Sequence, residues 1–172
     1  MYPQQSSLLA PDKAKTSQCH HFKDAIIMQF SLETNSDYYV IRAYTPEELI
    51  VTPPQDMAAT VKRIQDPRFG NQAVAIELIT STSLIMPRLL IKNWTNTRYD
   101  DISADELAKV QEHQPEIVLL GSGGTLKWPA KGVRECLLAQ GIGVEVMSSG
   151  AACRTYNILM EEQRHVAAIV FF

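Results

Sequence analysis

Two apolar runs in the last third of the chain each end in a turn rich in glycine and serine. The first run covers residues 116–120 and leads to the turn at 121–124, and the second covers 142–147 and leads to the turn at 148–150. Each turn is followed, directly or after a few residues, by a segment whose apolar positions have helical spacing. This alternation is typical of an α/β sheet whose loops gather at one end. The first run is apolar at consecutive positions, which predicts a strand buried on both faces.

Further strands are predicted where β-branched and aromatic residues cluster or alternate with polar residues. They span residues 29–33, 38–44, 49–51, 73–79, 84–86, 89–91 and 166–172. The first two could form a β-hairpin, and the last is so apolar that it should be buried. The pattern therefore predicts the α/β class with an N-terminal β-hairpin region.

Three helices are predicted from their capping and terminating residues. Ser103 can cap the first, and Glu106 can return a hydrogen bond to the N–H of Ser103. The second is expected over residues 129–140, with proline at its first position and glycine just after its end. The third is expected over residues 151–162, after the serine-containing turn that would cap it.

Length, charge and cysteine content narrow the class of protein. The 172 residues are enough for one domain with a core, and no apolar run is long enough for a membrane helix. The net charge of −3 argues against a general nucleic-acid-binding role, which usually needs a basic face. Three widely spaced cysteines and the absence of a signal-peptide pattern favour a reducing compartment, and we expect the cytoplasm.

The N-terminus differs in composition from the rest of the chain. Residues 1–27 are rich in Gln, Ser, Pro and Lys and are predicted to form a flexible tail, with a single domain over 28–172. The Cys-His-His cluster at 19–21 lacks the paired spacing of a metal site. No metal and no cofactor are therefore predicted.

The glycine-rich turn at 121–124 is the first candidate ligand site. Its backbone N–H groups could approach an anion closely, with help from Lys127. The phosphate-loop pattern fails because threonine follows the last glycine where lysine is required, and the dinucleotide pattern lacks its third glycine. The glycines could instead serve only a left-handed turn that leaves the sheet. The ligand-binding candidates here are Gly121, Ser122, Gly123 and Lys127.

The start of the last helix is the second candidate site. Cys153 would lie within about one turn of the helix N-terminus, where the dipole lowers the pKa of a thiol, and Arg154 adds a positive charge. Cys153 could therefore be a catalytic nucleophile or a redox sensor, but we favour a small buried hydrophobe, because no His or Asp close to it in sequence forms an obvious base. Arg154 could hold a carboxylate or phosphate, or could pair with an acid of this chain. The ligand-binding candidates here are Arg154, Thr155 and Asn157.

Three strings of sequence carry a resemblance to a known family. They span residues 115–123, 141–147 and 151–159. They resemble a family of small α/β proteins that includes mitochondrial respiratory complex I assembly factor 3 and the adipogenesis-associated domain proteins. The likeness runs from about residue 83 to residue 172 and extends to the strands within 29–51, whereas the stretch 53–82 looks longer than the family pattern.

The resemblance implies a three-layer domain with a central mixed β-sheet flanked by helices, and a pocket between the 121–123 loop and the start of the last helix. It also implies assembly or scaffolding, with a protein partner that belongs to a respiratory complex. We therefore favour a binding or assembly protein over an enzyme. The alternative is a small cysteine-dependent enzyme or sensor that binds an anionic ligand between the 121–124 loop and Cys153. An oligomer is compatible with either hypothesis.

Overall fold

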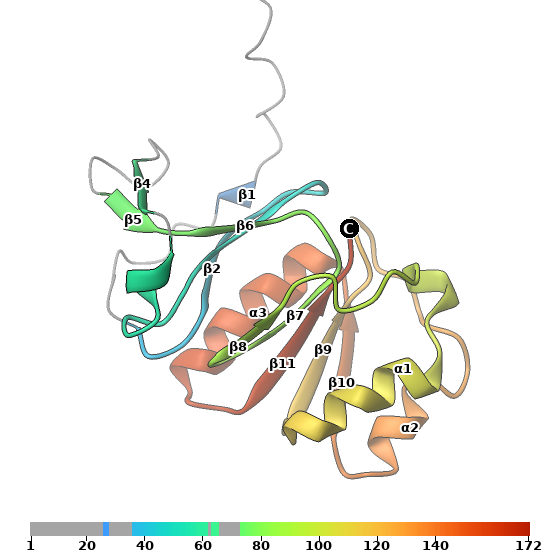
Figure 1. Ribbon diagram of the computed structural model, residues 1–172. Helices are drawn as coiled ribbons and strands as arrows, with labels where there is room; N and C mark the ends of the chain where they lie inside the picture. The colour runs from blue at the N-terminus through green and yellow to red at the C-terminus, as the bar shows by residue number, and fades with distance from the viewer. Residues whose placement is uncertain (1–25, 28–35, 62, 66–72) are drawn as a thin grey trace, which may run out of the picture.

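A mixed sheet of five strands forms the centre of the structure (Figure 1). The computed structural model describes residues 26–27, 36–61, 63–65 and 73–172. The strands, in spatial order, are β10 (Gly143–Met147), β9 (Ile117–Gly121), β11 (Val166–Val170), β7 (Ser83–Met86) and β8 (Leu89–Ile91). β10, β9 and β11 run parallel, whereas β7 and β8 are added as antiparallel strands. The predicted mixed sheet is therefore confirmed.

The two central strands are buried on both faces. Side chains of β9 and β11 alternate between two apolar clusters, because successive residues of a strand point to opposite faces. Leu119 and Ala168 belong to one cluster, and Leu120 and Ile169 belong to the other. Every residue of β11 is buried, as expected from its composition, although the strand ends at Val170 rather than at residue 172.

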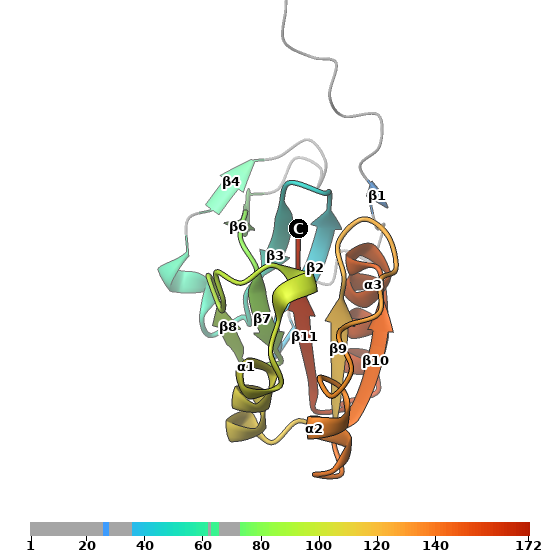
Figure 2. The ribbon, with the colours of Figure 1, turned by 90° about the vertical axis from the view of Figure 1, so that its right-hand side faces the viewer.

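Helices cover both faces of this sheet, as Figures 1 and 2 show. The long helix α3 (Ser149–Glu161) packs on one face, against β9 and β11. The short helices α1 (Ala104–Ala108) and α2 (Glu135–Leu138), with the 3₁₀ turn η4 (Lys109–His113), supply apolar side chains to the cluster on the opposite face. The layers predicted by the family resemblance are thus present.

A second sheet, of four antiparallel strands, packs beside α3. It comprises β1 (Ile26–Ile27), β2 (Val40–Tyr44), β3 (Leu49–Thr52) and β6 (Glu77–Ile79) in that spatial order. β2 and β3 form a hairpin with a register shift between Ile41 and Ala43. The strand expected over 29–33 lies outside the described residues, as do residues 1–25 of the predicted tail. β1 pairs with β2 along the edge of β2 that is opposite to β3.

The strand predicted over residues 73–79 is wrong as a single element. Ile76 separates β5 (Ala73–Ala75), which pairs with β4 (Arg63–Gln65), from β6, which pairs with β3. The chain is not in strand conformation at Ile76, and the segments on either side of it pair into different sheets. Two short 3₁₀ turns complete the description: η1 (Ala58–Thr60) lies between β3 and β4, and η3 (Tyr99–Asp101) precedes α1.

The second predicted helix is also shorter than expected. The helix over 129–140 is reduced to the four residues of α2, because the chain forms turns through 131–134 and Gly132 has a φ of 94°. α3, by contrast, begins at Ser149, two residues earlier than predicted, because Ser148 is its N-cap and accepts a hydrogen bond from the N–H of Ala151.

The capping box of α1 is present and also anchors the loop before it. The N–H of Glu106 donates to the Ser103 hydroxyl, and the N–H of Ser103 donates to the Glu106 carboxylate, at 3.2 and 3.3 Å. The hydroxyls of Thr95 and Thr97 each donate to the same carboxylate at 2.7 Å. The bonds from Thr97 and then Thr95 lower the pKa of Glu106 to about 2.

We predict that Glu106→Ala lowers the free energy of unfolding by about 1–2 kcal/mol at pH 7, because hydrogen bonds to a charged acceptor are lost. A carboxylate with a lowered pKa stabilises the fold above its unfolded pKa and loses that effect as the pH falls toward the folded pKa. The difference from wild type should therefore shrink between about pH 4.5 and pH 2. Urea denaturation across this range measures it. Asp105→Ala, in the same helical turn, is the control, and an equal loss in both variants would contradict the role of Glu106.

Candidate binding site

The structure brings the two glycine- and serine-rich turns into direct contact. The N–H of Ser149 donates to the carbonyl oxygen of Gly123 at 2.8 Å, and the N–H of Gly123 donates to the Ser149 hydroxyl at 2.8 Å. That hydroxyl in turn donates to the carbonyl oxygen of Phe171 at 2.6 Å. The start of α3 is therefore bonded to the ends of both β9 and β11.

Gly121 permits this close approach. A Cβ atom at this position would lie 2.9 Å from both Cα and Oγ of Ser149 and 3.2 Å from the carbonyl oxygen of Ile169. Gly123 has a φ of 93°, in the region that favours glycine. Ser149 thus fills the space next to Gly121, and the glycines serve the turn and the packing of the helix.

Ser122 and Lys127 are connected through the backbone of the loop that follows the glycine-rich turn. The Ser122 hydroxyl is buried, accepts a hydrogen bond from the N–H of Lys127 at 3.0 Å and lies 2.8 Å from the carbonyl oxygen of Thr125. The hydroxyl of Tyr99 donates to the carbonyl oxygen of Lys127 at 2.7 Å. Lys127 Nζ lies on the surface, 3.4 Å from Asp100. Both polar groups of the Lys127 backbone are therefore held in place.

Ser122 and Lys127 also line a small pocket of about 230 Å³, together with Thr82, Thr97 and Phe172. Burial raises the pKa of Tyr99 to about 12, so its hydroxyl stays protonated and keeps its role as a donor.

Two exposed apolar residues lie on either side of Lys127 in the sequence. Leu126 and Trp128 are 54% and 66% exposed, and the guanidinium of Arg134 lies 5.2 Å from the centre of the Trp128 ring. This distance is typical of a cation–π contact. Sequence reasoning assigned no role to these two residues, because the exposure of an apolar side chain cannot be predicted from its type alone.

Cys153 does not have the environment expected of a reactive thiol. Its side chain is fully buried between α3 and the central sheet, and this burial raises the pKa of the thiol. Arg154 acts in the opposite direction but has the smaller effect. The expectation of a lowered pKa is wrong, since loss of hydration outweighs the nearby positive charge and the helix N-terminus.

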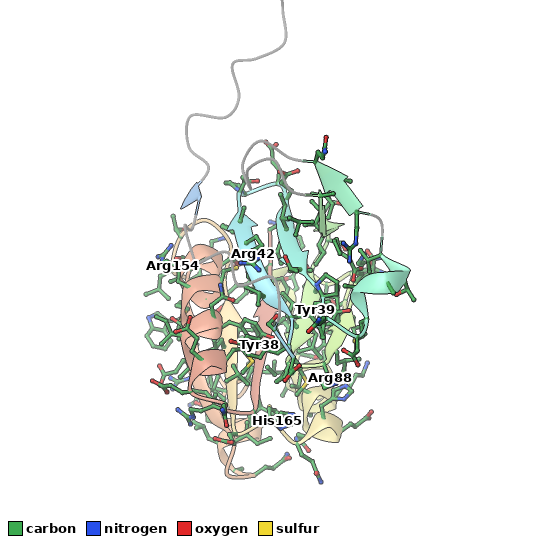
Figure 3. The ribbon with its side chains drawn as sticks, turned by 90° about the vertical axis from the view of Figure 1, so that its left-hand side faces the viewer. Tyr38, Tyr39, Arg42, Arg88, Arg154 and His165 are labelled. Carbon is green, nitrogen blue, oxygen red and sulfur yellow. The ribbon has the colours of Figure 1, made fainter. Side chains whose placement is uncertain are left out.

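Arg154 and Thr155 lie on the part of α3 that is partly exposed. An Arg154 Nη1 atom is 3.7 Å from the position that a Cβ of Gly150 would occupy, so the guanidinium extends back toward the start of the helix. Figure 3 shows Arg154 near one end of α3 and His165 near the other. Arg154 is therefore separated from the basic residues around His165.

Asn157 binds the backbone of the second sheet. Its Oδ1 accepts a hydrogen bond from the N–H of Ile41 at 3.0 Å, and its Nδ2 donates to the carbonyl oxygen of Ile41 at 2.7 Å. Asn157 is 3% exposed. This candidate ligand-binding residue therefore connects α3 to β2.

A groove that sequence reasoning missed lies between the end of α3 and the start of β2. Its volume is about 730 Å³. The lining residues come from three separate stretches of chain: 36–42, the β7–β8 turn at 87–88, and 157–165. They include Arg42, Arg88, Arg164 and His165, most of which are labelled in Figure 3. No local motif joins residues so distant in sequence, so only the fold could place them together.

Metal ligands and membrane spans were also sought. Within the described residues, no group of three or more His, Cys, Asp or Glu side chains is arranged to hold a metal ion. In the same part of the chain no helix has the length and apolar character required to cross a bilayer.

Comparison with known proteins places the chain in a family. The family profile described as "Protein of unknown function (DUF498/DUF598)" matches residues 64–171. A structure from Bordetella parapertussis aligns with a TM-score of 0.59 and 26% identity, over 79% of this chain and 97% of that one. The overall architecture is thus shared with a solved protein over most of both chains.

Two of the named relatives differ in how much of their length the chain matches. The "13 kDa major membrane protein" of Francisella tularensis is 27% identical over 121 residues, which are 66% of this chain and 98% of that protein. The "NADH dehydrogenase [ubiquinone] 1 alpha subcomplex assembly factor 3" of Danio rerio is 34% identical over 86 residues, 49% of each chain. The match therefore spans nearly the whole Francisella protein but about half of the zebrafish assembly factor.

We predict that Asn157→Ala lowers the free energy of unfolding by about 2–4 kcal/mol, because it leaves two buried backbone groups of Ile41 without partners. Asn157→Asp should be at least as harmful at pH 7, since the carboxylate cannot donate to the carbonyl and carries a buried charge. Protonation restores a donor, so the difference between Asp and wild type should narrow as the pH falls. Chemical denaturation at several pH values measures this, with Thr155→Ala as the control. If Asn157→Ala lowered the free energy of unfolding by no more than Thr155→Ala does, the proposed role of the amide would be refuted.

We also predict that Cys153 resists alkylation in the native protein. Iodoacetamide should modify it only after denaturant unfolds the chain, because the thiol is buried and its pKa is raised. Peptide mass spectrometry can follow the partly exposed Cys136 in the same sample as an internal comparison. Rapid native modification of Cys153, with a titration midpoint below the ordinary thiol value of about 8.5, would contradict the structure.

Proposed function

The chain belongs to the DUF498/DUF598 family of proteins of unknown function, and we propose that it is a binding protein of the assembly type that takes part in building respiratory complex I. One observation carries this proposal: the 34% identity to an assembly factor of the NADH dehydrogenase 1 alpha subcomplex. The likeness covers half of that relative, so the partner and the step of assembly are proposals for this chain.

The chemistry of the described residues favours binding over catalysis. The cysteine that motivated an enzymatic alternative is buried and has a raised pKa, so the thiolate needed for nucleophilic attack is disfavoured. The glycine-rich turn contacts the start of α3 through Ser149. Both features act in folding, and neither supplies a group that would react with a substrate.

We place the docking surface for the assembly partner on the loop that carries Leu126 and Trp128. Tryptophan is among the residues that contribute most to binding energy in protein interfaces. Ser122 and Tyr99 fix the backbone of Lys127 on both sides, so the two apolar side chains are displayed on an ordered support. An ordered support favours binding because less conformational entropy is lost when the partner docks.

The charge of this loop indicates the partner's chemistry. Residues 124–134 contain Lys127, Lys131 and Arg134 and no acidic residue, in a chain whose net charge is −3. Asp100 offsets the charge of Lys127, so the positive charge comes from Lys131 and Arg134. A partner surface with an apolar cleft and carboxylates around its rim would complement it, since complementary charge steers association and fixes orientation. The proposed partner is therefore an acidic protein surface of the growing complex. The cytoplasm remains the predicted compartment.

We predict that deletion of the gene, in a host that has complex I, reduces the amount of assembled complex and its NADH:ubiquinone oxidoreductase activity. Native gel electrophoresis and membrane activity assays measure the two quantities. Wild-type protein should restore both. Trp128→Ala should restore them poorly, because loss of a central aromatic residue costs about 2 kcal/mol of binding, or about thirtyfold in affinity.

Ile158→Ala is the matched control, because Ile158 is an apolar residue of α3 with 50% exposure away from this loop. It should restore assembly fully. Unchanged complex I after the deletion would overturn the assembly function. Full restoration by Trp128→Ala would leave that function standing and would reject the loop as the docking surface.

A further inference from the structure

The outer face of α3 carries an exposed apolar residue between two opposite charges. Ile158 is 50% exposed, Arg154 lies one turn before it, and Glu162 lies one turn after it. Residues four positions apart lie on the same side of a helix, so these three side chains form one row. Buried residues of α3 such as Cys153 and Tyr156 lie on the opposite side. The row therefore points away from the core, on a helix that lies at the surface (Figure 3).

The two charges of this row have no ionic partner within the described residues. No ion pair or hydrogen bond joins the side chain of Arg154 or of Glu162 to another residue in the part of the chain that the structure describes. The sequence left open whether Arg154 pairs with an acid of this chain, and among the described residues it does not. Both side chains are therefore available to a binding partner.

Both charges also lie toward the ends of α3 where the helix dipole disfavours them. A helix is stabilised by acidic residues at its start and by basic residues at its end. α3 has no acidic residue in its first turn and no basic residue in its last turn. Arg154 instead extends back toward the start, and Glu161 and Glu162 lie at the end. A second helix that runs in the opposite direction would compensate this pattern.

We propose that the outer face of α3 binds a second copy of this chain, in a symmetric dimer whose α3 helices pack antiparallel with Ile158 at the two-fold axis. In such an interface every contact between two different residues occurs twice. Arg154 and Glu162 lie about 6 Å from Ile158 along the helix, in opposite directions. Arg154 of each copy therefore faces Glu162 of the other, and the two Ile158 side chains meet between the two ion pairs.

A second copy fits this face better than an unrelated helix does. An unrelated partner would need an acid, an apolar residue and a base at the same spacing, whereas a second copy supplies them by symmetry. A parallel pair of α3 helices would instead bring like charges together, which disfavours that arrangement. Ala151 and Thr155, beside the row, are small and partly exposed, so two helices can approach to the usual distance of about 8–10 Å.

The contact is small, so the dimer should be weak. α3 has 13 residues and is about 20 Å long, and two such helices bury less than the roughly 1,200 Å² of a standard interface. We expect a dissociation constant of about 0.1 mM.

The dimer is independent of the proposed assembly function, because the docking loop that carries Leu126 and Trp128 is not part of α3. Ile158→Ala should weaken the dimer about tenfold, since it removes the central apolar contact, and should still restore complex I assembly. The two proposals can therefore fail separately.

Sedimentation equilibrium of the full chain, between about 10 µM and 1 mM, tests the dimer. Wild-type protein should change from monomer to dimer across this range. Arg154→Glu and Glu162→Arg should each weaken association at least about tenfold, because symmetry makes each substitution create two like-charge contacts. An equimolar mixture of the two variants should associate about as tightly as wild type, because one copy then carries acids at both ends of the row and the other carries bases.

Lys109→Glu and Glu112→Arg are the matched controls. These two exposed residues belong to η4, on the opposite face of the central sheet, and the same charge reversals there should leave association unchanged. Arg154 and Glu162 are not buried, so their variants should fold, and urea denaturation verifies this.

Three results would overturn the proposal. The first is wild-type protein that stays monomeric up to about 1 mM. The second is association that Arg154→Glu and Glu162→Arg weaken no more than the controls do, because the chain would then dimerise through another surface. The third is a mixture of Arg154→Glu and Glu162→Arg that associates no better than either variant alone, which would exclude the antiparallel arrangement about Ile158.

Discussion

The pair of hydrogen bonds between the Asn157 amide and the backbone of Ile41 links the two halves of this fold. The residues are 116 positions apart, and both bonds are buried. Because an amide has one donor group and one acceptor, it satisfies both the N–H and the carbonyl of Ile41, as a neighbouring strand would. The end of α3 and the start of β2 are therefore held at a fixed separation, and the groove is the space between them. A polar residue of the core thus determines where a ligand could bind.

The opposite end of α3 is fixed by close packing. Ser149 lies against Gly121 and is bonded to Gly123 and to the carbonyl of Phe171, so the helix cannot move away from the ends of β9 and β11. In open α/β sheets, ligands usually bind at the carboxyl ends of the strands. Here Ser149 occupies the space beside Gly121, and the larger groove lies near the other end of the helix.

The sequence predicted most of the regular elements because their signals are local. The capping box at Ser103 and the apolar runs of β9 and β11 depend only on neighbouring residues, and each was found where expected. The break at Ile76 and the short α2 were missed because strand partners and turn geometry depend on the rest of the chain. The groove was missed for the same reason, since its walls come from three distant stretches. The interpretation of Cys153 as a buried hydrophobe was favoured from sequence, but the choice between it and a reactive thiol needs the burial of the side chain, which decides the pKa of a thiol and is absent from local sequence.

The glycine-rich turn at 121–124, which was a candidate ligand site, supports the exposed side chains of Leu126 and Trp128. Ser122 at its centre accepts the hydrogen bond that fixes Lys127, and Tyr99 fixes the other side of that residue. The side chains on either side, Leu126 and Trp128, are consequently held in the open without a flexible backbone beneath them. An exposed tryptophan on an ordered loop loses little conformational entropy when it binds a partner. The same residue on a flexible loop would bind less tightly, because the loop would lose conformational entropy on ordering. The glycine- and serine-rich sequence thus bears on binding through the loop that it anchors.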